Sequence, residues 1–217
     1  MPITTWRAEN ILSFRDVIRF SNNIGTSKIA LRMGKQLYTY YNAFLLGKKT
    51  DIDFPGEQSG SMTHPKYWSR ASPLSLSFGY EVNLSLLQLA RSFSMFANDG
   101  WCVQPHFSRD TTPKWYDTGV SLQTIKQSRD IISIDTMGNT ARRGQIPGYH
   151  IYGKTGSARL ITDGTYDATR GIYTFIALVE NRSYQRIIAT CVREPQGNNI
   201  YAARVAVPLF KSIAQEM

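Results

Sequence analysis

The spacing of apolar residues in this chain changes near residue 149. Upstream, apolar residues recur at helical intervals; downstream, they form β-branched and aromatic runs that polar turns separate. The three runs cover 149–157, 171–180 and 186–193. Helices followed by sequential antiparallel strands are typical of an α+β fold. We therefore predict a mainly helical region over 13–148, and an antiparallel sheet of about three strands with a terminal helix over 149–217.

The upstream region holds several signals for the start and end of helices. Ser85 with Gln88 forms a capping box at the start of the most amphipathic segment. Helices are expected at about 13–20, 24–33, 36–46, 85–97, 122–137 and 199–217. Proline and glycine punctuate 48–83 and 101–120, so both are expected to be surface segments with little regular structure. A further loop, 162–170, is expected between the first two strands.

The first predicted strand carries the clearest cluster of binding groups. Lys154 supplies a positive charge, and Thr155 and Ser157 supply hydroxyl donors. Gly156 has no side chain, so the backbone of a ligand can lie against the strand there. Together these groups suit a substrate carboxylate. A K-T-G triplet alone is a common match, and the simplest alternative is a surface strand near a turn.

Composition narrows the class of partner. The 217 residues include 25 Lys and Arg against 16 Asp and Glu, which gives a formal net charge of +9 and favours an anionic partner. The basic residues are scattered and no nucleic-acid-binding signature occurs, so nucleic acid is not expected. Cys102 and Cys191 lie far apart and the three histidines are isolated, so neither a metal nor a cofactor is expected. No apolar run reaches the length of a membrane span, and no signal peptide is recognised.

A second motif makes the K-T-G triplet more specific. Ser21-Asn22-Asn23 matches S-x-N, at the end of one predicted helix and the start of another. Further ordered matches are Asp53–Glu57, Phe78–Tyr80, Leu86–Arg91 and Ala206–Phe210. In this order the segments resemble the transpeptidase domain of class B penicillin-binding proteins. Within that family they are most similar to the FtsI-type peptidoglycan D,D-transpeptidases, or penicillin-binding protein 3.

The resemblance implies roles for the motif residues. Ser21 would relay a proton, and Asn23 would hold the substrate amide and the lysine of an S-x-x-K motif. Lys154, Thr155 and Ser157 would hold the terminal carboxylate of a stem peptide or a β-lactam, and the backbone N–H of Ser157 would form half of an oxyanion hole. Ser157 stands where threonine is more usual in the family, and the hydroxyl is kept. The structural alternatives are a helix-terminus turn for Ser21 and Asn23 and an ordinary strand hydroxyl for Ser157.

The nucleophile motif of the family, S-x-x-K, does not occur in these 217 residues. In the family it lies about fifty residues before S-x-N. Thr111-Thr112-Pro113-Lys114 has T-x-x-K spacing but the wrong position. The chain therefore resembles the C-terminal two-thirds of a transpeptidase domain, with an incomplete sheet, and by itself it is expected to be catalytically inactive.

The resemblance also implies a location and partners. Members of the family act in septal cell-wall synthesis at the periplasmic face of the bacterial inner membrane, with divisome proteins as partners; their membrane anchor is not within this chain. In the family fold, the first strand pairs with the strand that corresponds to 186–193. Without that neighbour the edge of 186–193 would present unpaired backbone groups, so self-association through this edge is expected.

Three interpretations stay open. The first is part of a division transpeptidase that binds substrate without covalent chemistry. The second is another serine acyl-enzyme of the superfamily, a β-lactamase, a D,D-carboxypeptidase or a β-lactam sensor, which the segments Leu86–Arg91 and Asp53–Glu57 disfavour. The third is a non-catalytic module that binds peptidoglycan or a divisome partner, which the missing nucleophile and the positive charge favour.

Overall fold

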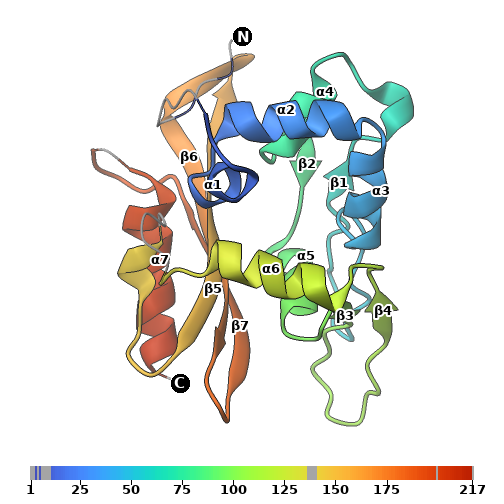
Figure 1. Ribbon diagram of the computed structural model, residues 1–217, viewed down its shortest axis with the longest axis vertical. Helices are drawn as coiled ribbons and strands as arrows, with labels where there is room; N and C mark the ends of the chain where they lie inside the picture. Colours follow the sequence, from blue (N-terminus) through green and yellow to red (C-terminus); the bar gives the residue numbers. More distant parts are fainter. Residues whose placement is uncertain (1–2, 4, 6–10, 136–140, 199, 217) are drawn as a thin grey trace. The chain divides into compact units, whose positions relative to one another are not determined.

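The computed structural model describes residues 3, 5, 11–135, 141–198 and 200–216. The chain divides into two compact units, Met1–Ile131 and Ile132–Met217, and each is described by itself (Figure 1). The first unit combines helices with two-stranded sheets, and the second is a three-stranded antiparallel sheet with a long helix. The α+β fold expected from the sequence is confirmed.

The first unit follows most of the predicted helices. Its elements are α1 (Phe14–Arg19), α2 (Asn23–Met33), α3 (Gln36–Ala43), β1 (Ser61–Met62), the 3-10 helix η1 (Pro65–Tyr67), α4 (Ser72–Ser77), β2 (Val82–Asn83), α5 (Leu86–Phe93), the 3-10 helix η2 (Ser94–Phe96), β3 (Trp101–Val103), β4 (Trp115–Asp117) and α6 (Leu122–Ile132), which ends across the boundary. Helix α3 ends earlier than expected, because Leu45 takes a left-handed backbone conformation with φ of 61°. Helix α6 also ends early, because Ser133 bridges to Tyr152. The end expected for α6, at 137, lies outside the described residues.

The expectation of little regular structure in 48–83 and 101–120 is wrong. The first segment contains α4 and the antiparallel pair β1–β2, and the second contains the antiparallel pair β3–β4. Strands of two or three residues are too short to show an alternating pattern. In α4, Pro73 lies in the first turn, where proline is tolerated because its missing N–H has no partner within the helix.

A small core joins α2, α3 and α4. Ala30, Leu37 and Leu76 are its buried members. The hydroxyl of Tyr41 on α3 donates to the carbonyl of Leu76 at 2.8 Å, and burial raises the pKa of Tyr41 to about 12. The neutral phenol is therefore the form that holds α3 against α4 across the physiological pH range.

Helix α5 holds a long loop in place through two buried polar residues. The predicted capping box is present: the hydroxyl of Ser85 accepts from Gln88 N, and the side chain of Gln88 accepts from Ser85 N. The Gln88 side-chain amide donates to the carbonyls of Lys48 and Ser59, each at 2.8 Å. Arg91 is only 4% exposed and donates to three carbonyls. They belong to Leu45, Lys48 and Lys49, at 2.5, 2.9 and 2.6 Å.

The second unit is built on a sheet with strand order β5-β6-β7. The strands are β5 (His150–Thr162), β6 (Thr165–Glu180) and β7 (Gln185–Arg193); the 3-10 helix η3 (Arg142–Gly144) precedes them and α7 (Ala202–Gln215) follows. Three antiparallel strands and a terminal helix were expected and are confirmed. Pro208 lies inside α7, and both ends expected for that helix, 199 and 217, lie outside the described residues.

The loop expected at 162–170 is wrong. Strands β5 and β6 continue through it and meet at the pair Thr162 and Thr165. Asp163 and Gly164 form a two-residue turn in which φ is 50° and 77°. An Asp-Gly pair favours this turn because both positions require positive φ.

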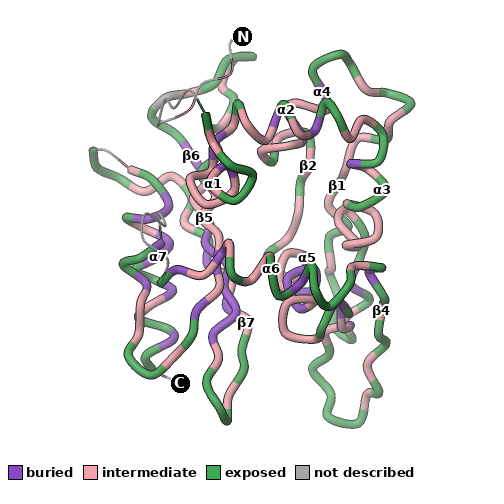
Figure 2. Tube along the Cα trace, viewed as in Figure 1, coloured by how far each residue is buried: buried purple, intermediate pink, exposed green. Residues whose placement is uncertain are grey.

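Helix α7 packs on one face of the sheet. Phe175 of β6 and Phe210 of α7 make an edge-to-face contact with ring centroids 4.8 Å apart. The buried core of this unit is Ile134, Ala141, Ile151, Phe175, Ala177, Val179, Ile188, Ala202, Ala206, Val207, Phe210 and Ala214 (Figure 2). Gly153 lies against this core, since an added Cβ would come within 2.6 Å of Phe175 Cζ. Residues 151, 153, 155 and 157 of β5 therefore face α7, and the even residues between them face away.

No helix in the described parts of the chain is long and apolar enough to cross a membrane. The described residues likewise contain no group of three or more His, Cys, Asp or Glu side chains placed to hold a metal ion.

Candidate active site

The S-x-N residues lie in the turn between α1 and α2. Ser21 adopts a left-handed backbone conformation with φ of 51°, which costs a non-glycine residue about 1 kcal/mol. Asn22 is the N-cap of α2, and its Oδ1 accepts from Gly25 N at 2.8 Å. Asn23 is the first residue of that helix. Ser21 and Asn23 therefore flank Asn22, the buried N-cap residue.

Asn22 and Gly25 also shape this turn, which was not predicted from the sequence. Asn22 is 5% exposed, so the middle residue of S-x-N is a structural one. An added Cβ on Gly25 would come within 2.6 Å of the Val17 side chain. Helices α1 and α2 therefore pack closely just beyond the turn. The signal available was an Asn three residues before a Gly at the start of a helix, which is the spacing of an N-cap bond.

The K-T-G residues lie in the middle of β5, on two faces of the strand. Lys154 and Gly156 face away from α7, and Thr155 and Ser157 face towards it. Ile134 N donates to the carbonyl of Ile151 at 3.0 Å from the side of β5 opposite to β6. Backbone groups alternate along a strand, so the N–H and C=O of Thr155 and Ser157 point to that same edge. A ligand that lies along this edge of β5 could therefore contact both Thr155 and Ser157.

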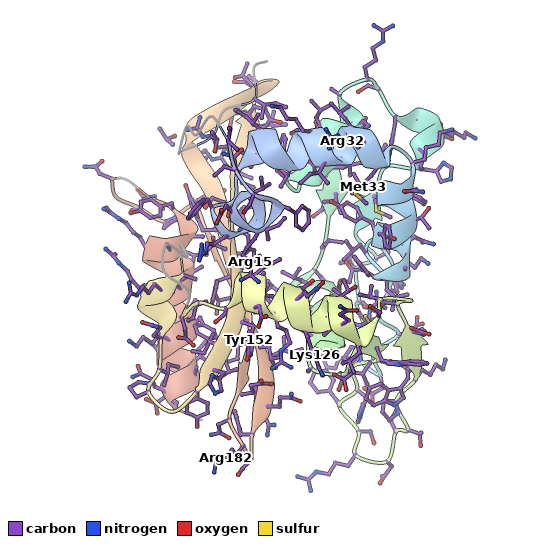
Figure 3. The ribbon with its side chains drawn as sticks, in the orientation of Figure 1. Arg15, Arg32, Met33, Lys126, Tyr152 and Arg182 are labelled. Atoms are coloured by element: carbon purple, nitrogen blue, oxygen red, sulfur yellow. The ribbon has the colours of Figure 1, made fainter. Side chains whose placement is uncertain are left out.

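Lys154 is the charged group of the cluster. Desolvation by burial lowers the pKa of the Lys154 ammonium group from 10.5 to about 8. Its Nζ lies 3.5 Å from the carbonyl of Thr155. A lysine with this pKa is mainly charged at neutral pH and loses its proton in mildly alkaline solution. Figure 3 shows Tyr152, two positions earlier on β5, among the side chains of this region.

Gly156 has a role within the sheet. An added Cβ would lie 2.6 Å from Thr174 Oγ1 on the paired strand β6. The absence of a side chain at Gly156 therefore makes room for a neighbouring threonine. The expectation that a ligand backbone lies there stays a prediction.

Ser157 makes a contact that the sequence does not indicate. Its Oγ accepts a hydrogen bond, at 3.1 Å, from the backbone N–H of Ala202, which is the first residue of α7. The residue is exposed, so its hydroxyl hydrogen can still be donated outward. Since 45 residues separate Ser157 from Ala202, no local pattern predicts this bond.

Ser21 and Asn23 belong to the first unit, and Lys154, Thr155, Gly156 and Ser157 belong to the second. The structure places each group within its own unit, so their meeting at one cleft stays a prediction. Thr111 lies in a surface loop, where its hydroxyl donates to Asp53 Oδ2 at 3.3 Å.

A shallow pocket of about 390 Å³ lies elsewhere in the second unit. It is lined by Gly148, His150, Asn181, Arg182 and Ser183, where the start of β5 meets the β6–β7 turn. Figure 3 labels Arg182 at this turn and Tyr152 further along the sheet. None of the motif residues lines this pocket.

Comparison with known proteins decides the family. The family model of the penicillin binding protein transpeptidase domain matches residues 2–215. The chain belongs to this family. It is 31% identical to the probable peptidoglycan D,D-transpeptidase PenA of Neisseria flavescens, over 93% of this chain and 51% of that protein.

Solved penicillin-binding proteins share the fold. The transpeptidase domain of penicillin-binding protein 3 from Burkholderia pseudomallei superposes with a TM-score of 0.87 and 29% identity, over 99% of this chain and 66% of the other. Penicillin-binding protein 3 from Mycobacterium tuberculosis, solved with ampicillin, gives a TM-score of 0.82 and 25% identity, over 99% of this chain and 52% of the other. The chain spans about half the length of the PenA relative and two-thirds or less of these solved chains.

In this member of the penicillin-binding family, the S-x-N residues lie in the turn before α2, and the K-T-G residues lie on β5. The family resemblance drawn from these short segments is confirmed. The roles of Ser21, Asn23, Lys154, Thr155, Gly156 and Ser157 are not tested by these comparisons, and they stay predictions.

Proposed function

We propose that this chain is the substrate-binding part of a peptidoglycan D,D-transpeptidase that cross-links stem peptides in septal cell-wall synthesis, and that it binds β-lactams. The observation that carries the proposal is the edge of β5. There the N–H groups of Thr155 and Ser157 point outward beside Lys154, whose lowered pKa marks a largely desolvated cation. A cation with outward N–H groups suits a carboxylate followed by a peptide carbonyl.

The roles follow from these groups. Lys154 attracts the terminal D-alanine carboxylate, and the hydroxyls of Thr155 and Ser157 donate to it. The outward N–H of Ser157 stabilises negative charge on the carbonyl that is attacked. Ser21 relays a proton and Asn23 holds the substrate amide; the N-cap bond of Asn22 keeps this turn in shape. Together, residues 1–217 act as part of one transpeptidase domain.

The proposed setting follows the family. Divisome proteins are its partners, and the periplasmic face of the bacterial inner membrane is its location. These assignments rest on kinship with penicillin-binding proteins such as PenA.

Binding of a dipeptide tests the carboxylate site. We expect an N-acyl-D-Ala-D-Ala peptide to bind the 217-residue chain in a calorimetric or NMR titration. The matched peptide amide, which lacks the carboxylate, should bind at least about tenfold more weakly, because the attraction between the carboxylate and the Lys154 charge is then lost. Equal binding of acid and amide would remove the proposed role of Lys154.

Labelling with a fluorescent penicillin tests the chemistry. Since S-x-x-K is absent from these residues, we expect no adduct on the chain that survives denaturation and gel electrophoresis. Reversible β-lactam binding should persist and should be displaced by N-acyl-D-Ala-D-Ala. A covalent adduct would show that another residue acts as the nucleophile. Binding of intact glycan strands without any affinity for the dipeptide would favour a non-catalytic peptidoglycan-binding module.

We also propose that the chain associates with itself through β7. In the described sheet β7 pairs with β6 alone. Glu194 N donates to Gly171 O, so by alternation Ile187, Ala189 and Cys191 direct their N–H and C=O groups away from β6. An open strand edge is a template for pairing with another strand.

Sedimentation velocity tests this self-association. We expect dimers or larger species at micromolar concentration, and a shift towards monomer in Ile187→Lys, since an edge lysine disfavours strand pairing. Leu209→Lys is the matched control, because it adds the same charge on an exposed position of α7. A clean monomer for the unmodified chain would contradict the proposal.

A further inference from the structure

The start of α7 does not use the local side-chain partners that usually satisfy a helix N-terminus. Its N-cap, Tyr201, makes no side-chain capping bond, and the first turn contains no acidic residue. The positive end of the helix dipole and its first N–H groups therefore favour a nearby acceptor or negative charge. Helix α7 is 14 residues long, so this dipole is fully developed.

Ser157 of β5 supplies the acceptor. Its Oγ lies 3.1 Å from Ala202 N, so a residue from the strand caps the helix. A serine hydroxyl has one donor and two acceptor positions. Accepting the Ala202 N–H leaves the Ser157 proton free for another group, and the accepted bond strengthens that donor.

We propose that α7 takes part in carboxylate binding through Ser157. A chain of two hydrogen bonds extends the positive potential of the helix N-terminus to the ligand. Ala202 N–H donates to Ser157 Oγ, and Ser157 O–H donates to the ligand carboxylate. Ser157 thus touches the ligand, and Ala202 is a positioning residue that acts through it. This inference rests on the proposed function, because it needs a carboxylate at the edge of β5.

The geometry gives Ser157 two donors with different directions. Its backbone N–H points to the edge of β5 opposite to β6, whereas its side chain lies on the face that α7 covers. The bond to Ala202 holds the side chain in one rotamer between strand and helix. A hydroxyl fixed in this way binds a carboxylate at lower entropic cost than a freely rotating one.

The variant Ala202→Pro removes the N–H and keeps Ser157. Proline is tolerated at the first position of a helix. Tyr201 already has φ of −154° and ψ of 162°, which is the extended conformation that a residue before proline prefers. We expect the affinity for N-acyl-D-Ala-D-Ala to fall by about three- to tenfold. Ser157→Ala should lose at least as much, and Ser157→Thr should stay close to the unmodified chain.

A double-mutant cycle separates the relay from general damage to α7. In the Ser157→Ala background, Ala202→Pro should cause no further loss of affinity. Ala203→Gly, in the same turn of α7, lowers helix stability without removing an N–H. It should therefore lower the thermal midpoint and leave the affinity unchanged.

The unmodified chain provides a second readout if Ala202→Pro does not fold. We expect the Ala202 amide proton signal to shift when the peptide acid is added, and to stay in place with the peptide amide. A folded Ala202→Pro variant with unchanged affinity, or an Ala202 signal that ignores saturating acid, would overturn the relay. If the unmodified chain does not bind the peptide acid at all, the proposed function is overturned instead.

Discussion

Affinity for an N-acyl-D-Ala-D-Ala peptide is expected to fall about tenfold for each pH unit above about 8. Burial lowers the pKa of Lys154 to about 8, so the free protein loses this charge in mildly alkaline solution. A neutral amine does not attract a carboxylate by charge, and binding above this pH must include protonation of Lys154. Calorimetric titration between pH 7 and pH 10 measures the profile.

Two variants serve as controls for this pH profile. Lys154→Arg keeps the charge throughout the range, since arginine stays protonated, and its profile should be flat. Lys126→Arg changes a lysine on the exposed side of α6 and should leave the profile as it is (Figure 3). A flat profile for the unmodified chain would show that Lys154 does not pair with the ligand.

The same lowered pKa has a consequence for folding. In the unfolded chain Lys154 titrates near its ordinary value of 10.5. Below pH 8 the native state carries a desolvated charge, which costs free energy. As the pH rises from 8 to 10.5 the native state loses this proton first, so the contribution of Lys154 to stability increases over that window. Binding and stability should therefore move in opposite directions above pH 8.

Replacing Arg91 by methionine is expected to destabilise the first unit by about 3–4 kcal/mol. The guanidinium group donates to three carbonyls of the segment after α3, and Met leaves all three without this donor. Glu57 accepts from Thr50 N and Asp51 N in the same loop, so the damage should spread along it. Denaturant unfolding gives the free energy.

Intrinsic fluorescence reports on this unit, because all four tryptophans lie before residue 131. Arg91→Lys should recover part of the loss, since an ammonium group reaches fewer carbonyls than the planar guanidinium group. Arg32→Ala, at an exposed position of α2, should change stability by less than about 0.5 kcal/mol. If Arg91→Met unfolded like the Arg32 control, the three carbonyl bonds would carry little net energy.

Sequence patterns predicted the elements that depend on interactions between residues close together in the chain. The capping box of Ser85 and Gln88 marked α5 correctly, and β-branched runs marked the three long strands. The Asp163-Gly164 pair is a local signal for a tight turn, but it lies in a polar stretch that also favours a longer loop. Strands as short as β3 depend on packing against α5 and leave no periodic trace.

The candidate site divides in the same way. Motif spacing found Ser21, Asn23 and the residues around Lys154, and it gave their roles only through family resemblance. The bond between Ser157 and Ala202 joins positions 45 residues apart, so it depends on how α7 docks on the sheet. The pKa of Lys154 depends on burial, which the residue letters do not state.

Lys154 and Ser157 take opposite sides of one strand, and this makes the site sensitive to the length of the chain. Inserting or deleting a single residue between Ile151 and Lys154 would move the lysine to the face of the sheet that packs against α7. It would move the serine to the opposite face. Substitutions at these positions weaken one contact at a time, whereas an insertion exchanges the two layers at once. Natural variation along this strand should therefore change residue identity far more often than residue number.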